Sequence, residues 1–281
     1  MTILAAVVLA LAAGFTEIFP VSGTGHLYIL AKLLGVPASG AEFQSFRGML
    51  YLGVAVSGVL FYRTQLYDIL HENLVLLGLA RPGSRQRGEP FGRRLGQLLL
   101  FAALPMIPAL LLNGLRVEME RGSHTLAILS GLLCLSGAAL YFASRGARGK
   151  RTIYQMTLPD ALTTGLAQMI TVYPGLSRSG FTVSVLLARG LDGPAAAEFT
   201  GLMGIPVFLA AGIVQLATAG SAGGRFAAAP YMILGFSLSA LTGFFAHRLF
   251  TELMARRRPT AFAYWSWGAG ILALILFLIS A

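Results

Sequence analysis

The chain has 281 residues, of which 56% are hydrophobic and 11% are charged, and its formal net charge is +10. Soluble domains carry about 25% charged residues, so this composition excludes an ordinary soluble protein and predicts an all-α polytopic membrane protein. The short alternating segments of an outer-membrane barrel do not occur in the sequence. A single cysteine, Cys134, excludes an intramolecular disulfide and a cysteine-based metal site.

Ten apolar segments follow one another along the chain, and we expect each to form a helix. They lie at 1–14, 26–36, 48–62, 95–113, 125–144, 158–172, 181–191, 199–219, 228–247 and 261–281. A helix needs about 20 residues to cross a bilayer core, and two pairs, at 1–36 and 158–191, consist of shorter segments. Each short pair flanks a polar stretch. Interrupted apolar segments of this kind are typical of a binding site built from broken helices.

The basic residues gather in three connecting segments, at 63–94, 145–151 and 248–258. Nucleic-acid binding needs a continuous basic surface with aromatic partners, so this distribution argues against a nucleic-acid partner. Lys and Arg are retained in the cytoplasmic loops of membrane proteins, and we therefore expect all three segments on the cytoplasmic side. With that orientation, segment 48–62 runs inward and segment 199–219 runs outward.

Two short similarities indicate an internal repeat. G-F-T-E-I-F at 14–19 resembles G-L-A-Q-M-I at 165–170, and F-R-G-M-L at 46–50 resembles F-T-G-L-M at 199–203, with offsets of about half the chain. Because the matched segments run in opposite directions, the sequence predicts one membrane domain made of two inverted-topology repeats, about 1–144 and about 158–281. The site is then expected at the repeat interface. The alternative is coincidence, since few residues match.

The first polar stretch lies at 14–26 and contains Glu17 and His26. Histidine can act as base, acid or nucleophile in phosphoryl transfer, and Glu17 can orient it or hold a divalent cation. Pro20 and two glycines are expected to break the helix, which leaves backbone N–H groups free to face an anion. The alternative for His26 is a histidine that only hydrogen-bonds the start of the next helix.

The second polar stretch, at 171–182, places Arg178 between Ser177 and Ser179. An arginine in apolar surroundings costs about 2.5–3.5 kcal/mol on insertion scales, so it has a partner or a watery cavity. A guanidinium flanked by hydroxyls and by freely approached backbone suits a phosphate group. The alternative is a structural ion pair between Arg178 and Glu17, and this pair does not exclude a phosphate site.

At these residues the chain resembles the bacterial undecaprenyl-diphosphate phosphatase family of the bacitracin-resistance type. The motifs of that family read approximately G-[LIVF]-T-E-[FW]-[LIVF]-P-[IV]-S-S-T-G-H and P-G-x-S-R-S-G. This chain has G-F-T-E-I-F-P-V-S-G-T-G-H at 14–26 and P-G-L-S-R-S-G at 174–180. A weaker likeness extends to A-E-F-T-G-L-M-G-I-P at 197–206 and to the overall length.

The resemblance implies an enzyme of the bacterial inner membrane with re-entrant helix pairs and a site open to the periplasmic side. It would remove the terminal phosphate of undecaprenyl diphosphate and recycle the lipid carrier of cell-wall synthesis. Glu17, His26 and Arg178 carry over as catalytic residues. The expected phosphate-binding residues are Ser22, Gly23, Thr24, Gly25, Ser177, Ser179, Gly180 and Arg47. The membrane and a polyprenyl diphosphate or phosphate lipid are the expected partners, and the oligomeric state, including a homodimer, is left open.

Four positions depart from the family pattern. Ala13 and Arg47 stand where glutamates are expected, Gly23 where a second serine is expected, and Tyr51 where a glutamine is expected. Losing the carboxylates weakens a Mg²⁺ or Ca²⁺ site and leaves Glu17 as its candidate ligand, so a metal-independent reaction in which Arg47 supplies the charge is the other expectation. The leading hypothesis is a divergent phosphatase. The alternative is a polyprenyl-phosphate transporter that binds the lipid phosphate without cleaving it.

Overall fold

The computed structural model of the protein describes residues 1–81, 91–106, 119, 122, 124–146, 149–221, 226–256 and 259–280. In these ranges all regular structure is helical, apart from an isolated β-bridge between Arg151 and Leu191. The α-helices are α1 (Ile3–Thr16), α2 (Gly23–Leu33), α3 (Ala41–Phe61), α4 (Arg63–Leu76), α5 (Phe91–Ala103), α8 (Thr125–Gly146), α9 (Leu158–Met169), α10 (Arg178–Ala188), α11 (Gly193–Ser221), α12 (Ala229–Ala255) and α13 (Thr260–Ser280). The predicted all-α class is confirmed.

Four of the described helices, α8, α11, α12 and α13, are long and apolar enough to cross a membrane. Helices α3 and α4 form a pair bent by 76°, which counts as a fifth span if the pair is taken as one. Helix α1 has 14 residues and α10 has 11. At about 1.5 Å per residue both are shorter than the bilayer core of about 30 Å. The protein is thus a polytopic membrane protein that also contains short, interrupted helices.

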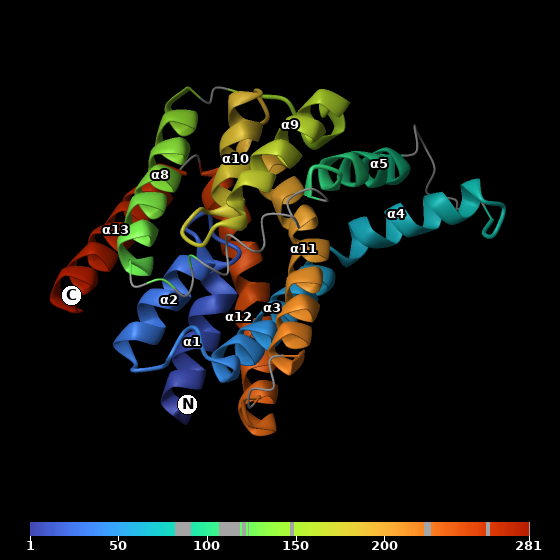
Figure 1. Ribbon diagram of the computed structural model, residues 1–281. Helices are drawn as coiled ribbons and strands as arrows, with labels where there is room; N and C mark the ends of the chain where they lie inside the picture. The colour runs from blue at the N-terminus through green and yellow to red at the C-terminus, as the bar shows by residue number, and fades with distance from the viewer. Residues whose placement is uncertain are drawn as a thin grey trace.

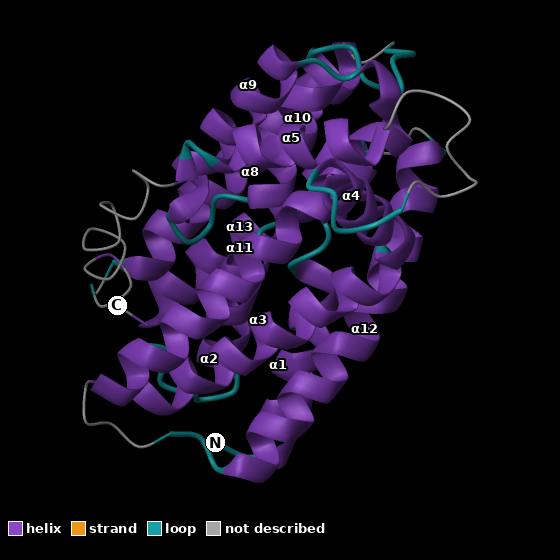
Figure 2. Cartoon of the chain, turned by 90° about the vertical axis from the view of Figure 1, so that its right-hand side faces the viewer, coloured by secondary structure: helices purple, strands orange, loops and turns teal. Residues whose placement is uncertain are grey.

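The two short helix pairs approach each other from opposite ends of the molecule. In Figure 1, α1 and α2 lie below and α9 and α10 lie above, and Figure 2 shows the same order after the turn of the view. Helix α3 packs between α11 and α12, while α8 pairs with α13 on the other side (Figure 1). The break between α1 and α2 and the break between α9 and α10 therefore both lie within the helix bundle.

Small residues let the long helices pack closely around these breaks. A side chain at Gly14 of α1 would collide with Thr242 of α12, and one at Gly212 of α11 would lie 2.9 Å from the carbonyl oxygen of Gly48 in α3. Contacts between small residues let helix backbones approach each other in membrane proteins. The glycines of this chain thus fix the spacing of the helices that surround the site.

Several predicted boundaries are wrong. The segment 63–94, expected as a loop, contains all of α4 and the start of α5, because its spaced leucines and polar residues form a helix too polar to stand out by hydropathy. Helix α12 continues to Ala255, through most of the basic segment expected after residue 247. The part of segment 95–113 beyond residue 106 lies outside the described residues, as do Arg85, Arg87, Arg148, Arg257 and Arg258.

The described parts of the three basic segments lie at one end of the molecule. Arg94 donates a hydrogen bond from Nη2 to the carbonyl oxygen of Met156, 2.8 Å away, just after the second segment. The turn at 190–193 packs against Gly149 of the second segment and against Met254 of the third. The described parts of the three segments are therefore neighbours in the structure, and the side of the membrane on which they lie stays a prediction.

An ionic cluster connects the start of α9 to Arg151 and Arg189. Asp160 is fully buried and pairs with Arg151 at 2.6 Å and with Arg189 at 2.7 Å. Burial alone would raise the pKa of the Asp160 carboxyl, but hydrogen bonds from Arg151, Thr157 and Arg189 outweigh it and hold the pKa well below its usual range. The ionised Asp160 carboxylate therefore stabilises the folded protein at neutral pH. This stabilisation is lost as the pH falls below the ordinary pKa range of a carboxyl group.

Asp160→Asn is expected to lower the free energy of unfolding by about 2–3 kcal/mol, because it weakens hydrogen bonds to a charged buried group. Thermal or denaturant unfolding of the purified protein in detergent at pH 7 measures the change. Glu252→Gln is the matched control, since Glu252 pairs with Arg248 at 3.4 Å on an exposed helix face, and such pairs contribute about 0.3–0.5 kcal/mol. Equal effects of the two substitutions would contradict the assigned role of Asp160.

Candidate functional site

The site forms where the first break, residues 17–22, meets the second break, residues 170–177. Helix α2 is capped by Ser22, whose side-chain oxygen accepts a hydrogen bond from the Gly25 N–H at 3.4 Å. Helix α10 is capped in the same way by Ser177, which accepts from the Gly180 N–H at 3.0 Å. Helix N-termini carry partial positive charge and attract anions. Two such N-termini face the same region.

The two breaks contact each other directly. Ser179 donates its hydroxyl hydrogen bond to the carbonyl oxygen of Phe19 at 2.8 Å. A side chain at Gly180 would lie 3.2 Å from the carbonyl oxygen of Pro20, and one at Gly25 would lie 3.5 Å from the Cα of Gly175. The structure thus brings the two polar stretches together, as the sequence predicted. Since the Ser179 hydroxyl already bonds Phe19, its phosphate-binding role stays a prediction.

Helix α8 supports the second break with a serine that the motifs do not contain. The hydroxyl oxygen of Ser136 accepts a hydrogen bond from the Ser177 N–H at 2.9 Å and lies 3.2 Å from the Gly175 carbonyl oxygen, to which it can donate. Ser136 is fully buried in an apolar helix. Its position in a membrane span was the one sequence signal that could have identified it.

Ser22 has an unusual backbone conformation. Its φ of 67° is the one positive φ of a non-glycine residue in the described ranges, and such conformations cost about 1–3 kcal/mol. The turned backbone directs its carbonyl oxygen to both the N–H and the ring Nδ1 of His26, at 3.2 and 2.8 Å. The expectation that glycines leave the N–H groups of 22–26 free is therefore wrong for Gly25 and His26, which lie in the first turn of α2.

A charged cluster of Glu17, Thr24, Arg47 and Arg178 lies at the contact between the breaks. Glu17 lies against Gly23 at the start of α2, and the charges of both arginines act on its carboxyl group. Its Oε1 atom is buried and has no hydrogen-bond partner among the described residues. The salt bridges of the described chain do not include a direct pair between Arg178 and Glu17. With one carboxylate and two guanidinium groups, the cluster favours an anionic ligand.

Arg47 of α3 is fully buried and is held by the polar groups around it. Its Nη2 donates to Gln44 Oε1 at 2.7 Å, and its guanidinium lies over the rings of Tyr28 and Tyr51 at 5.6 and 5.9 Å. The Tyr51 hydroxyl in turn lies 3.0 Å from the Thr24 hydroxyl. Two positions that depart from the family pattern, 47 and 51, are thus part of the site.

Arg178, the first residue of α10, is half-buried and is oriented by α11. Its guanidinium carbon lies 4.5 Å from the centroid of the Phe208 ring, and its Nη1 donates to the Thr200 carbonyl oxygen at 3.4 Å. A side chain at Gly204 would lie 2.9 Å from Nη2, so glycine leaves the room that the guanidinium occupies. Cation–π contact and a backbone acceptor together set the direction of the guanidinium plane.

His26 makes two ring hydrogen bonds. Trp265 of α13 donates from Nε1 to His26 Nε2 at 2.8 Å. Because indole is only a donor, Nε2 is the acceptor, and Nδ1 carries the proton that is donated to the Ser22 carbonyl at 2.8 Å. These contacts agree with the alternative of a histidine bonded to the helix start, and neither joins His26 to Glu17 or Arg178. Its catalytic role stays a prediction.

Gly23, the first residue of α2, lies directly against Glu17. A Cβ atom at this position would collide with the Glu17 side chain, including its carboxyl carbon. The carboxyl group therefore occupies the room that a serine side chain would take. The Glu17 carboxylate thus lies where the hydroxyl of a serine at 23 would lie.

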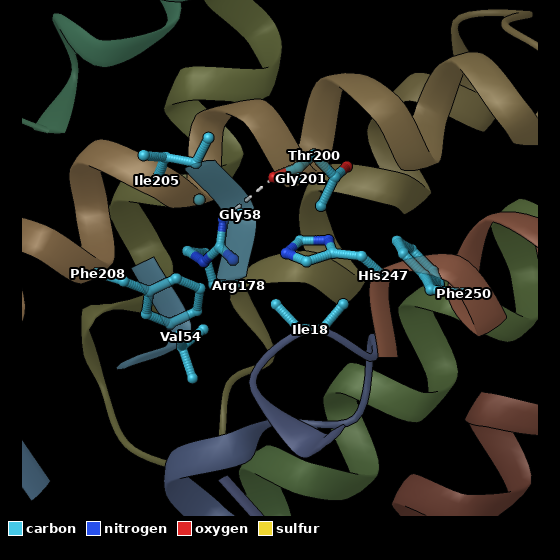
Figure 3. Close-up of a pocket in the computed structure, with 11 residues that line it drawn as sticks. Ile18, Val54, Gly58, Arg178, Thr200, Gly201, Ile205, Phe208, His247 and Phe250 are labelled. Carbon is cyan, nitrogen blue, oxygen red and sulfur yellow. Dashed lines mark hydrogen bonds between the residues drawn. The ribbon is translucent and has the colours of Figure 1, made fainter. Parts of the chain in front are cut away.

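A small cavity lies beside Arg178, between α3, α10, α11 and α12 (Figure 3). Its volume is about 10 Å³, close to the room of a single water molecule. His247 and Thr200 line it with Arg178, whereas Glu17 and His26 do not. Sequence analysis did not single out His247, although a histidine within an apolar span is itself a signal of function.

The donor set of the site does not fit a divalent cation held by protein ligands alone. Ca²⁺ takes six to eight oxygen ligands, and Mg²⁺ is usually bound through carboxylates. Among the described residues there is no group of three His, Cys, Asp or Glu side chains that could hold a metal ion. Within the described part of the site Glu17 is the one carboxylate, and the two arginines near it repel a cation.

Fold and site together define a polytopic helical membrane protein with a cationic centre at two joined helix breaks. The family model described as bacitracin resistance protein BacA matches residues 6–272. The chain belongs to this family. It is 30% identical to the undecaprenyl-diphosphatase of Carboxydothermus hydrogenoformans, over 96% of both chains. It is 32% identical to that of Syntrophotalea carbinolica over 96% of this chain and 97% of the relative, and 29% identical to that of Alkaliphilus metalliredigens over 99% and 100%.

Proposed function

We propose that the protein hydrolyses undecaprenyl diphosphate to undecaprenyl phosphate and inorganic phosphate, and so recycles the lipid carrier of cell-wall synthesis. Its family and its relatives named undecaprenyl-diphosphatase support this activity. The observation that carries the proposal is the cluster at the joined breaks, where Arg47 and Arg178 lie over the neighbouring rings of Tyr51 and Phe208, whose centroids are 5.9 Å apart. Guanidinium groups suit a diphosphate, and fixed cations stabilise the charge of phosphoryl transfer.

In the proposed reaction a water oxygen attacks the terminal phosphorus, and the bond from that phosphorus to the bridging oxygen breaks. The products are inorganic phosphate and the lipid monophosphate. Arg178 and Arg47 hold the phosphoryl oxygens and offset the charge that develops on the bridging oxygen. His26 accepts the proton of the attacking water at Nε2, after Trp265 has released this atom, because the Ser22 carbonyl keeps the proton on Nδ1.

Two inverted repeats are proposed to build the site. Helices α1, α2 and α3 and helices α9, α10 and α11 follow the same order of two short helices, separated by a break, and one long helix. One motif lies at each break, and α3 packs against α11. We place the repeats at about 1–144 and about 158–281, in the bacterial inner membrane, with the basic segments cytoplasmic and the site open to the periplasmic side.

The test is phosphate release from undecaprenyl diphosphate by the purified protein in detergent, with Mg²⁺, with Ca²⁺ and with EDTA. We expect release in all three conditions, because the site offers fixed cations in place of carboxylate ligands. Binding of undecaprenyl phosphate is measured in parallel. Binding without release under any condition would overturn the enzyme and favour a polyprenyl-phosphate transporter. The observation behind this alternative is Gly23, which provides no hydroxyl at the first break.

Arg47→Glu is expected to make phosphate release depend on Mg²⁺ or Ca²⁺, with at least about a tenfold difference between metal and EDTA. The substitution replaces a fixed cation by a second carboxylate near Glu17, which creates oxygen ligands for a hard cation. Arg47→Lys is the matched control, since it retains the charge and should remain independent of metal. An unchanged metal response of Arg47→Glu would contradict the role given to Arg47.

A further inference from the structure

The cavity beside Arg178 contains polar groups that the proposed reaction does not use. His247 reaches it from α12, and Thr200 reaches it from α11 (Figure 3). Both residues are buried, with 1% of their surface exposed. Phe61 stacks on the His247 ring at 5.3 Å, and Tyr62 packs edge-on against it at 5.1 Å. The imidazole is therefore held in place by the aromatic rings around it.

These polar groups have no partners within the described part of the protein. Neither ring nitrogen of His247 makes a hydrogen bond there, and neither does the Thr200 hydroxyl. A buried polar group left unpaired costs about 1–3 kcal/mol, and most such groups in folded proteins are satisfied by protein or by ordered water. Three unsatisfied atoms around one small cavity therefore indicate a small polar ligand.

Size and chemistry identify that ligand as water. The cavity volume of about 10 Å³ admits one water molecule and excludes a phosphate group. A buried water makes about three hydrogen bonds. This one would accept from an N–H of Arg178 and donate to a lone pair of His247 and to the Thr200 hydroxyl oxygen. The water would thus use one donor and two acceptors of the lining, which is the number of hydrogen bonds that one buried water makes.

We propose that this cavity binds one water molecule that links His247 to Arg178, and that His247 is thereby a positioning residue for the guanidinium. Among the described residues, the side chain of Arg178 makes one hydrogen bond, of 3.4 Å, to the Thr200 carbonyl. The water adds a second anchor on the side of His247, so the remaining N–H groups keep a fixed direction toward the diphosphate. A displacement of about 1 Å at a catalytic group can cost about 100-fold in rate.

The activity test compares His247→Phe with His247→Gln and rests on the proposed function. Phenylalanine retains the ring that packs on Phe61 and Tyr62 but cannot bind water, whereas glutamine retains a donor and an acceptor. We expect His247→Phe to lower kcat for phosphate release about 10- to 100-fold. His247→Gln should remain within about threefold of the unsubstituted protein, and so should Ile205→Val, which alters an apolar wall of the same cavity.

Equal rates of His247→Phe and the unsubstituted protein would overturn the positioning role, as would equal losses in His247→Phe and His247→Gln. A second measurement does not depend on catalysis or on the folding of a variant. A high-resolution crystal structure of the unsubstituted protein should show one ordered water within about 3 Å of His247 and Arg178. A dry cavity would overturn the inference even if the protein is an active phosphatase. An ordered water in a protein without phosphatase activity would instead overturn the proposed function alone.

Discussion

Arg178→Ala is expected to lower kcat/KM for phosphate release from undecaprenyl diphosphate by at least about 1,000-fold, which is the order of loss when an arginine that stabilises phosphoryl transfer is removed. The substitution deletes the guanidinium whose charge acts on Glu17, together with its stacking on Phe208. Initial rates of phosphate release at several lipid concentrations measure the effect. Both kcat and KM should change, because the same group binds the diphosphate and stabilises the transition state.

Two controls separate the role of Arg178 from general damage. Arg178→Lys keeps the charge without the bidentate geometry and should fall between the alanine variant and the unsubstituted protein. Arg248→Ala removes an arginine whose side chain is 74% exposed, and its activity should be unchanged. Substantial turnover by Arg178→Ala, with thermal unfolding like that of the unsubstituted protein, would refute the catalytic assignment.

His26→Ala should lower kcat at least about 100-fold, the usual contribution of a general acid or base. Nε2 of His26 carries the lone pair that can accept a proton, since Nδ1 donates its own proton to the Ser22 carbonyl. The rate of phosphate release is measured under saturating lipid, so that kcat is observed directly. Loss of kcat with little change in KM is the expected pattern, because His26 acts on the attacking water rather than on the bound diphosphate.

Trp265→Phe is the matched control for this prediction. It removes the N–H that donates to His26 Nε2 at 2.8 Å and leaves the histidine in place. A neutral hydrogen bond contributes about 1 kcal/mol, so kcat should change by less than about tenfold. A loss in Trp265→Phe as large as that in His26→Ala would mean that the indole, rather than the imidazole, carries the function. More than a tenth of the activity in His26→Ala would likewise contradict the assignment.

The long apolar helices could be predicted from the sequence because their signal is local. Helices α8 and α13 correspond closely to the apolar segments 125–144 and 261–281. Helix α4 could not be found in this way, since polar and charged residues interrupt its apolar ones and none of its residues is buried. Helix α4 is stabilised by its backbone hydrogen bonds and by packing against α5. Packing between helices of this kind is hard to detect from the hydropathy of the sequence.

The contact between the two polar stretches could be predicted from their motifs, and the hydrogen bond from Ser179 to the Phe19 carbonyl shows this contact. The roles of their residues in binding and catalysis stay predictions. Ser136, Phe208 and Trp265 were not found, because each comes from another helix and reaches the site through contacts between helices. A sequence pattern records neighbours along one helix, whereas these contacts depend on how separate helices cross.

The close fit of Gly23 against Glu17 couples the two positions energetically. Since the carboxyl group fills the room of the missing side chain, a serine introduced at 23 would force the Glu17 side chain to turn and move its carboxylate. The effects of substitutions at 17 and 23 on activity are therefore expected to be non-additive, because each side chain decides which conformation the other can adopt.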